Sequence, residues 1–130
     1  MRVLVVDDNR DMLESMRLLL AHAGHEAEIS DNADRALEIQ STRPADVLVT
    51  DIFMPGTDGL ETIVEFRARW PELRIVAMSG GGMVARRDYL QVAREAGADA
   101  MLRKPFEPQR LIETVERLAI RGRSPNSGDA

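Results

Sequence analysis

Val3-Leu4-Val5-Val6-Asp7-Asp8 is a short apolar run that ends in two adjacent carboxylates. A second apolar run, Val47-Leu48-Val49-Thr50, is closed in the same way by Asp51. Short β-branched runs closed by polar residues are typical of buried parallel strands, and ligands bind at the carboxyl edge of such sheets. We therefore expect these three acids to converge. Neighbouring carboxylates repel one another unless a cation compensates them, so the pattern favours an Mg²⁺ site.

Strand and helix patterns alternate along the rest of the chain, which indicates an α/β fold with a parallel sheet and crossover helices. We expect strands at residues 3–6, 27–29, 47–50, 73–78 and 100–102. Amphipathic helices are expected between residues 9 and 24, 33 and 43, 58 and 70, 85 and 96, and 111 and 119. The first helix is capped by Asp8 or Asn9. Pro55, Gly56 and Gly59 predict a loop after the third strand.

Length and composition limit the possible functions. The 130 residues, 44% of them hydrophobic, fit one domain, which we place at residues 1–120, followed by a frayed polar tail at 121–130. A net charge of −5 argues against a nucleic-acid partner. No apolar run approaches the roughly 20 residues of a membrane span, and the sequence enters a predicted strand at once, so we expect no signal peptide. With no cysteine and no export signal, we expect a cytoplasmic protein.

Two further polar residues follow the last two predicted strands. Ser79 follows the fourth strand and Lys104 follows the fifth, directly before Pro105 and Phe106. Taken alone, a lysine before a proline is most often a solvated loop end. On position alone, a serine here is as often an ordinary turn residue as a functional one. Together with the acids, however, they place a hydroxyl and a cation at the same edge of the sheet.

With these residues the chain resembles the receiver domain of bacterial two-component response regulators, including the stand-alone chemotaxis regulator. The resemblance rests on Asp7-Asp8, on the segment from Asp51 to Gly59 (Asp-Ile-Phe-Met-Pro-Gly-Thr-Asp-Gly), on Ser79-Gly80 and on Lys104-Pro105-Phe106, and it covers residues 1 to about 120. It implies a flavodoxin-like doubly wound sheet of five parallel strands in the order 2-1-3-4-5, with five helices.

The resemblance also implies a role for each residue of the site. Asp51 would accept a phosphoryl group from a phosphohistidine, and Asp8, Asp51 and the backbone carbonyl of Phe53 would ligate Mg²⁺, with Asp7 holding a metal-bound water. Lys104 would contact the phosphoryl oxygens, and a cis peptide bond to Pro105 would aim its side chain. The hydroxyl of Ser79 would sense the phosphoryl group.

By the same resemblance, the domain is a signalling switch rather than an enzyme. Its donor would be a sensor histidine kinase or a histidine phosphotransfer protein, and phosphorylation would alter the surface of the fourth helix, fifth strand and fifth helix for an unknown protein target. The chain stops after the fifth helix, so we expect a stand-alone receiver or a fragment of a longer regulator. The kinase, the target, the oligomeric state and the phosphoryl lifetime do not follow from the sequence.

Two positions depart from the family pattern. Receivers usually carry an aromatic residue three positions before the lysine, and its ring turns inward on activation; here that position is Met101. The segment after Ser79 is also longer than in the chemotaxis regulator, with the excess in Gly80-Gly81-Gly82. We expect this loop, rather than a ring, to carry the switch.

Two other classes fit part of the pattern. A small Mg²⁺-dependent phosphatase of the haloacid dehalogenase type also phosphorylates an aspartate at a strand end, but it needs a second acid where this chain has Phe53. A flavodoxin-like binder of a nucleotide or flavin needs a phosphate-cradling turn after the first strand. Here that place holds Asp8-Asn9-Arg10-Asp11, whose acids would repel phosphate.

Overall fold

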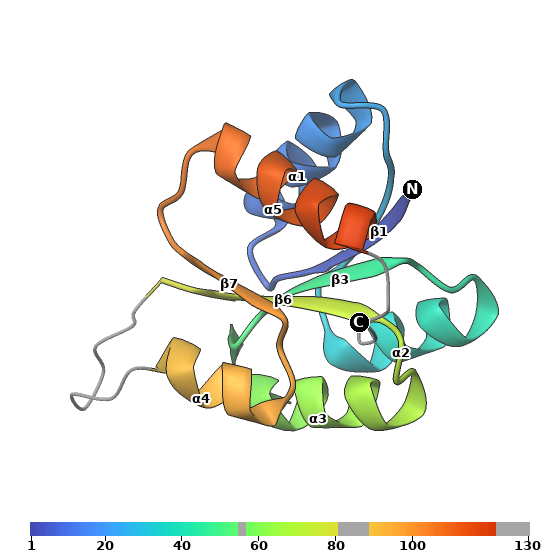
Figure 1. The fold of residues 1–130 in the computed structure, drawn as a ribbon, viewed down its shortest axis with the longest axis vertical. Helices are drawn as coiled ribbons and strands as arrows, with labels where there is room; N and C mark the ends of the chain where they lie inside the picture. Colours follow the sequence, from blue (N-terminus) through green and yellow to red (C-terminus); the bar gives the residue numbers. More distant parts are fainter. Residues whose placement is uncertain (55–56, 81–88, 122–130) are drawn as a thin grey trace.

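The computed structural model describes residues 1–54, 57–80 and 89–121. Its centre is a five-stranded parallel sheet in the order β2-β1-β3-β6-β7 (Figure 1). The strands are β1 (Arg2–Val6), β2 (Glu26–Ser30), β3 (Val47–Asp51), β6 (Arg74–Ser79) and β7 (Ala100–Arg103). Counting these five alone, the order is the 2-1-3-4-5 expected from the sequence, so the predicted fold is confirmed.

Helices cover both faces of the sheet. One face carries α1 (Arg10–His22) and α5 (Pro108–Arg121), and the other carries α2 (Ala33–Thr42), α3 (Gly59–Arg69) and α4 (Tyr89–Ala96) (Figure 1). The described part of α4 starts after the predicted start, which lies in residues 81–88 outside the described ranges. Asn9, not Asp8, caps α1, because its side chain accepts a hydrogen bond of 3.0 Å from the Met12 N–H.

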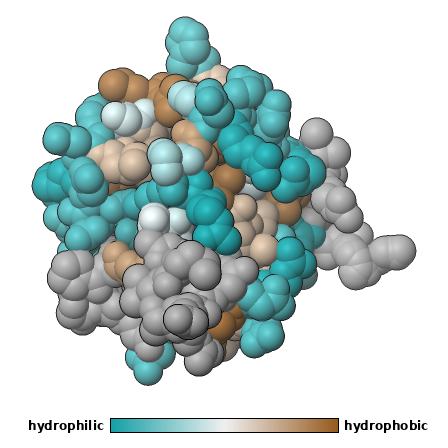
Figure 2. Space-filling model, turned by 90° about the vertical axis from the view of Figure 1, so that its left-hand side faces the viewer, coloured by the Kyte–Doolittle hydropathy of each residue, from teal (hydrophilic) through white to brown (hydrophobic). Residues whose placement is uncertain are grey.

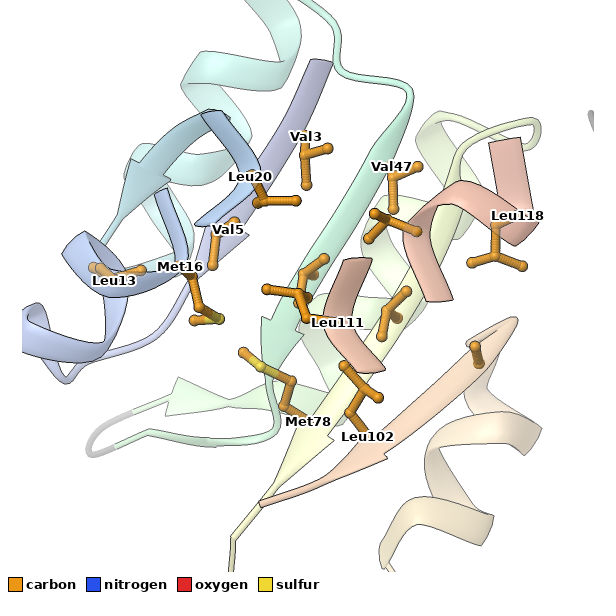
Figure 3. Packing of buried hydrophobic residues seen from close by; sticks show 14 residues of the cluster. Val3, Val5, Leu13, Met16, Leu20, Val47, Met78, Leu102, Leu111 and Leu118 are labelled. Atoms are coloured by element: carbon orange, nitrogen blue, oxygen red, sulfur yellow. The ribbon is translucent and has the colours of Figure 1, made fainter. Parts of the chain in front are cut away.

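Each face of the sheet buries its own hydrophobic cluster, because successive side chains of a strand point to opposite sides. Val3 and Val5 of β1 face α1 and α5, while Leu4 and Val6 face the other three helices. Figure 3 shows the first cluster, where Met16 of α1 and Leu111 of α5 lie over the sheet. All four apolar residues of β1 are at most 1% exposed, which explains why this strand reads as a continuous apolar run.

The sequence missed a short antiparallel hairpin, β4 (Phe53–Met54) with β5 (Thr57–Asp58), in the segment expected to be a loop. Two residues per strand are too few to show an alternation of apolar and polar residues. The hairpin returns the chain to Gly59, where α3 begins. A Cβ atom at Gly59 would lie 2.3 Å from the Ile52 Cα, so the backbone of Gly59 packs directly on the residue after Asp51.

The Gly59→Ala substitution is therefore expected to lower the free energy of unfolding by about 2 kcal/mol, because the hairpin must shift away from Ile52. Urea denaturation measures this loss. Gly80→Ala is the matched control, since a Cβ there meets the Lys104 side chain at an ordinary 3.6 Å and should change stability by less than about 0.5 kcal/mol. Equal stability of the two variants would contradict the role assigned to Gly59.

Candidate functional site

The predicted polar residues lie at the carboxyl edge of the sheet, at the ends of four of its five strands. Asp7 follows β1, Asp51 ends β3, Ser79 ends β6, and Lys104 follows β7. Figure 2 views the molecule from this side, and the described part of the surface is mostly hydrophilic with small hydrophobic patches. The parallel register places these residues side by side, as the sequence predicts.

Asp7, Asp8 and Asp51 form an acidic cluster in which each residue offers a carboxylate oxygen, and these oxygens lie within 4.8 Å of one another. Asp7 and Asp51 are buried, at 0% and 5% exposure, whereas Asp8 is exposed. Oxygen donors at this spacing are what a hard divalent cation takes, and the exposed Asp8 leaves a side open to solvent. The donor set of the cluster therefore fits Mg²⁺.

The ammonium of Lys104 lies between the two buried acids. Its Nζ donates to Asp7 Oδ2 at 2.7 Å and to Asp51 Oδ2 at 3.4 Å. Burial by itself lowers the pKa of Lys104, but the hydrogen bond to Asp7 and the charges of Asp51 and Asp7 outweigh it and raise the pKa above the usual lysine value. Lys104 therefore remains a cation at neutral pH and offsets part of the acidic charge.

The carboxylate of Asp51 is held by the hairpin of β4 and β5 that follows it. Its Oδ1 accepts a hydrogen bond of 3.1 Å from the Phe53 N–H, while Oδ2 faces Lys104. Burial raises the pKa of Asp51, and the charge of Asp7 adds to this, so that together they outweigh the lowering by the Phe53 hydrogen bond and Lys104. A further cation at the cluster would favour the ionised carboxylate.

This raised pKa predicts a pH-dependent stability difference for Asp51→Asn. The folded state keeps the Asp51 proton at pH values where the unfolded chain has lost it, so this group's contribution to stability falls as pH rises through the folded pKa. Without Mg²⁺ at pH 7, the variant should be more stable by about 1 kcal/mol, or about 3 °C in Tm.

Thermal unfolding in a chelator between pH 4 and 7 tests this expectation. The advantage of Asp51→Asn should shrink as pH falls toward about 4, near the ordinary aspartate pKa, and vanish only below it, where both folded and unfolded chains hold the proton. Asp34→Asn, at an exposed position in the first turn of α2, should show no such trend. A variant that is less stable than wild type at pH 7 would contradict the electrostatic account.

Ser79 is fully buried, and its Oγ makes no hydrogen bond with any residue in the described ranges. A buried hydroxyl without a partner costs free energy, so it marks a place where a ligand oxygen could bind. The Ser79 carbonyl accepts a hydrogen bond of 2.8 Å from the Lys104 N–H. The Lys104-Pro105 peptide bond is cis, as the resemblance implied.

One residue of this edge was missed as a site residue. Asn9 was expected only as a helix cap, but its backbone N–H also donates to Asp7 Oδ1 at 2.9 Å. Both oxygens of Asp7 thus accept a hydrogen bond, one from the Asn9 N–H before α1 and the other from Lys104. The signal in the sequence is the aspartate two residues before a helix cap, a spacing at which side chains accept from the backbone.

The two departures from the family pattern have different outcomes. Met101 is partly buried and packs against the cluster on the α2, α3 and α4 face. Gly81 and Gly82 lie outside the described residues, so the proposed loop switch is not tested.

A cavity of about 660 Å³, lined by residues that include Trp70, Leu73 and Leu118, lies at the opposite edge of the sheet, away from the acidic cluster.

Comparisons with known proteins identify the family of the chain. Residues 3–116 match the response regulator receiver domain family. The response regulator MprA of Mycobacterium leprae is 32% identical over the whole chain, which covers 56% of that protein. FleR of Pseudomonas aeruginosa is 33% identical over 97% of the chain, which covers 26% of FleR. The chain thus spans about half or less of the length of these curated relatives.

Solved structures give the same result. The receiver domain of NtrX from Brucella abortus matches with a TM-score of 0.82 at 34% identity, over 89% of this chain and 96% of that one. The chemotaxis protein CheY4 of Vibrio cholerae matches with a TM-score of 0.82 at 27% identity, over 90% and 97%.

These matches favour neither a haloacid dehalogenase-type phosphatase nor a flavodoxin-like nucleotide or flavin binder. Within the described ranges, no helix has both the length and the apolar character needed to cross a bilayer. The chain belongs to the receiver domains of response regulators, which are phosphorylation-dependent switches of two-component signalling.

Proposed function

We propose that Asp51 is the phosphoacceptor of this receiver and that Asp7, Asp8, Asp51 and the backbone carbonyl of Phe53 form its Mg²⁺ site, Asp7 through a metal-bound water. The observation that carries the proposal is the convergence of three carboxylates within 4.8 Å, two of them in contact with Lys104. Bound Mg²⁺ would supply charge neutralisation for the carboxylates and the phosphoryl oxygens.

The chain's own residues would then perform the transfer. An ionised Asp51 oxygen attacks phosphorus, the bond from phosphorus to the donor's histidine nitrogen breaks, and the electron pair leaves with that nitrogen. Asp51 needs no general base, because a carboxylate has no proton to lose once it is ionised. Lys104, which already lies 3.4 Å from Asp51 Oδ2, would pair with the phosphoryl oxygens.

Ser79 would be a second residue, besides Lys104, that binds the phosphoryl oxygens. Its buried Oγ has no partner in the described ranges, so a phosphoryl oxygen would satisfy it. The loop from Gly80 to Gly82 would then be drawn toward Asp51. We propose that this movement is the switch, because the position of the usual inward-turning aromatic residue is occupied by Met101.

The partners follow from this chemistry. We propose that a sensor histidine kinase or a histidine phosphotransfer protein in the cytoplasm supplies the phosphoryl group. A downstream protein would read the surface of α4, β7 and α5. The receiver domain, at residues 1–120, would act as a regulatory phosphoacceptor and not as an enzyme with a separate substrate. Of the tail predicted at residues 121–130, Arg121 ends α5 and the rest lies outside the described residues.

Phosphorylation of the purified protein tests the proposal. With Mg²⁺ and acetyl phosphate, the protein should gain one phosphoryl group, and mass spectrometry of its peptides should place the group on Asp51. A chelator should prevent the reaction. A group found on a serine or histidine, or an equal yield without Mg²⁺, would overturn the assignment.

Ser79→Ala should separate sensing from stability. Removing a buried hydroxyl that has no partner among the described residues should leave stability unchanged or raise it by up to about 1 kcal/mol. The affinity for beryllofluoride, which stands in for the phosphoryl group on Asp51, should nevertheless fall about tenfold, the effect of one hydrogen bond to a charged group.

Ser30→Ala is the matched control for this substitution. The Ser30 hydroxyl is also buried but donates to the Asn32 carbonyl at 2.8 Å, so its removal should cost about 1 kcal/mol of stability. Calorimetry and urea denaturation measure the two quantities. A Ser79→Ala protein that binds beryllofluoride as tightly as wild type would contradict the sensing role.

A further inference from the structure

The placement of the Lys104 ammonium depends on the register of an edge strand. β7 has four residues and pairs only with β6 within the described sheet, and Lys104 follows directly after it. A shift of one residue would move Lys104 by about 3.3 Å and turn its side chain to the other face. Its contact of 2.7 Å with Asp7 would not survive such a shift.

Asp99, the residue before β7, fixes this register. Its backbone N–H donates to the Ile75 carbonyl at 2.7 Å, and its Oδ2 accepts from the Ile75 N–H at 2.8 Å. Both groups of Ile75 are thus bound by one residue. The next pair along the strands, Val76 with Ala100, follows from this attachment.

Arg67 of α3 holds Asp99 in this position. Its Nη2 donates to Asp99 Oδ2 at 2.7 Å and to the Gly97 carbonyl at 2.8 Å, and its Nη1 donates to the carbonyls of Leu73 at 2.7 Å and Pro71 at 2.8 Å. The guanidinium thus joins the segment that leads into β6 to the segment that leads into β7. A planar group with five fixed donors suits this task better than a lysine would.

Gly97 lets the backbone approach this guanidinium. Its φ of 129° lies in the region that favours glycine, and an added Cβ would lie 3.2 Å from the Arg67 Cγ. The approach allows the Gly97 carbonyl to accept from both Arg67 Nε and Nη2. Asp99 therefore meets Arg67 at a place where the backbone turns from α4 into β7.

We propose that Asp99 and Arg67 are positioning residues: they fix the register of β7 on β6 and so place the Lys104 ammonium against Asp7 and Asp51. They act from the end of the strands opposite to the acidic cluster. The inference rests on the proposed function, because it gives Lys104 the task of meeting the phosphoryl group.

A double-mutant cycle on beryllofluoride affinity tests this inference, with Mg²⁺ present and binding followed by calorimetry and by the ¹⁹F resonances of the bound group. Asp99→Ala should weaken binding about tenfold in the wild-type background and change the fluorine resonances. In a Lys104→Ala background the same substitution should have no further effect, because the group that it misplaces is gone.

Two further variants separate positioning from folding. Asp99→Asn keeps an oxygen that accepts from the Ile75 N–H and should bind within about threefold of wild type. Arg67→Met leaves the bonds between Asp99 and Ile75 in place and should lose about threefold, again only when Lys104 is present. Arg69 is an exposed arginine of the same helix, and its guanidinium lies over the Trp70 ring. The Arg69→Met variant should bind beryllofluoride like wild type.

The outcomes separate the two proposals. Failure of the wild-type protein to bind beryllofluoride with Mg²⁺ would overturn both. If wild type binds but Asp99→Ala binds equally well, or loses as much affinity without Lys104 as with it, the positioning role is wrong while the phosphoacceptor remains. If Asp99→Ala does not fold, Arg67→Met in the two backgrounds decides the question.

Discussion

Asp51→Asn is expected to abolish phosphorylation by acetyl phosphate with Mg²⁺. The amide keeps the shape of the side chain, and its oxygen can still accept from the Phe53 N–H, so the hairpin that holds it should remain. An amide, however, is a poor nucleophile and cannot form the acyl phosphate. The loss should therefore be complete while the fold is intact, and intact-mass spectrometry measures it.

The control for this result is a second aspartate that is converted in the same way. Asp34→Asn removes an exposed carboxylate from the first turn of α2 and should be phosphorylated like wild type. Far-ultraviolet circular dichroism of the Asp51 variant checks its fold. A folded Asp51→Asn protein that still gains the phosphoryl group would rule out Asp51 as the acceptor.

Asp8→Ala is expected to weaken Mg²⁺ binding, whereas Lys104→Ala is expected to keep it. Asp8 offers an exposed ligand oxygen, and its removal should weaken Mg²⁺ binding at least about tenfold. Lys104 brings one positive charge to three carboxylates, so its removal changes the charge of the group from −2 to −3. Mg²⁺ should then bind as tightly as in wild type or several-fold more tightly.

Calorimetric titration with Mg²⁺ measures both effects. Asp11→Ala, at an exposed acid in the first turn of α1, controls for the general loss of negative charge and should change the affinity little. The Lys104 variant should still fail to bind beryllofluoride as tightly as wild type, because the cation that pairs with the phosphoryl oxygens is absent. Equal Mg²⁺ binding by Asp8→Ala and wild type would contradict the proposed ligand set.

The fold and the main site residues could be predicted because they depend on patterns that the sequence contains. Buried parallel strands read as apolar runs, and the residue that ends each run lies at the same edge of the sheet, which brings Asp7, Asp51 and Lys104 together. The peripheral strand β2 was predicted too short, at 27–29 instead of Glu26–Ser30, because the charges of Glu26 and Glu28 interrupt its apolar character.

The features that were missed depend on contacts of the backbone, which leave little trace in a sequence pattern. The second task of Asn9 is performed by its N–H, a group that nearly every residue has. The hairpin of β4 and β5 is too short for periodicity, and Asp99 and Arg67 are far apart in the chain and ordinary in type. Long-range polar contacts of this kind become visible only when the fold is known.

The strand order also has a consequence for the synthesis of the protein. All three acids of the cluster come from the first 51 residues, and β1 can pair with β2 and β3 before β6 and β7 leave the ribosome. Lys104, which neutralises part of their charge, is synthesised after all three acids. A nascent chain that has reached only β3 would therefore bring three like charges together without this counterion. A divalent cation bound at the cluster, as proposed above for Mg²⁺, would supply the missing positive charge while the sheet is still incomplete.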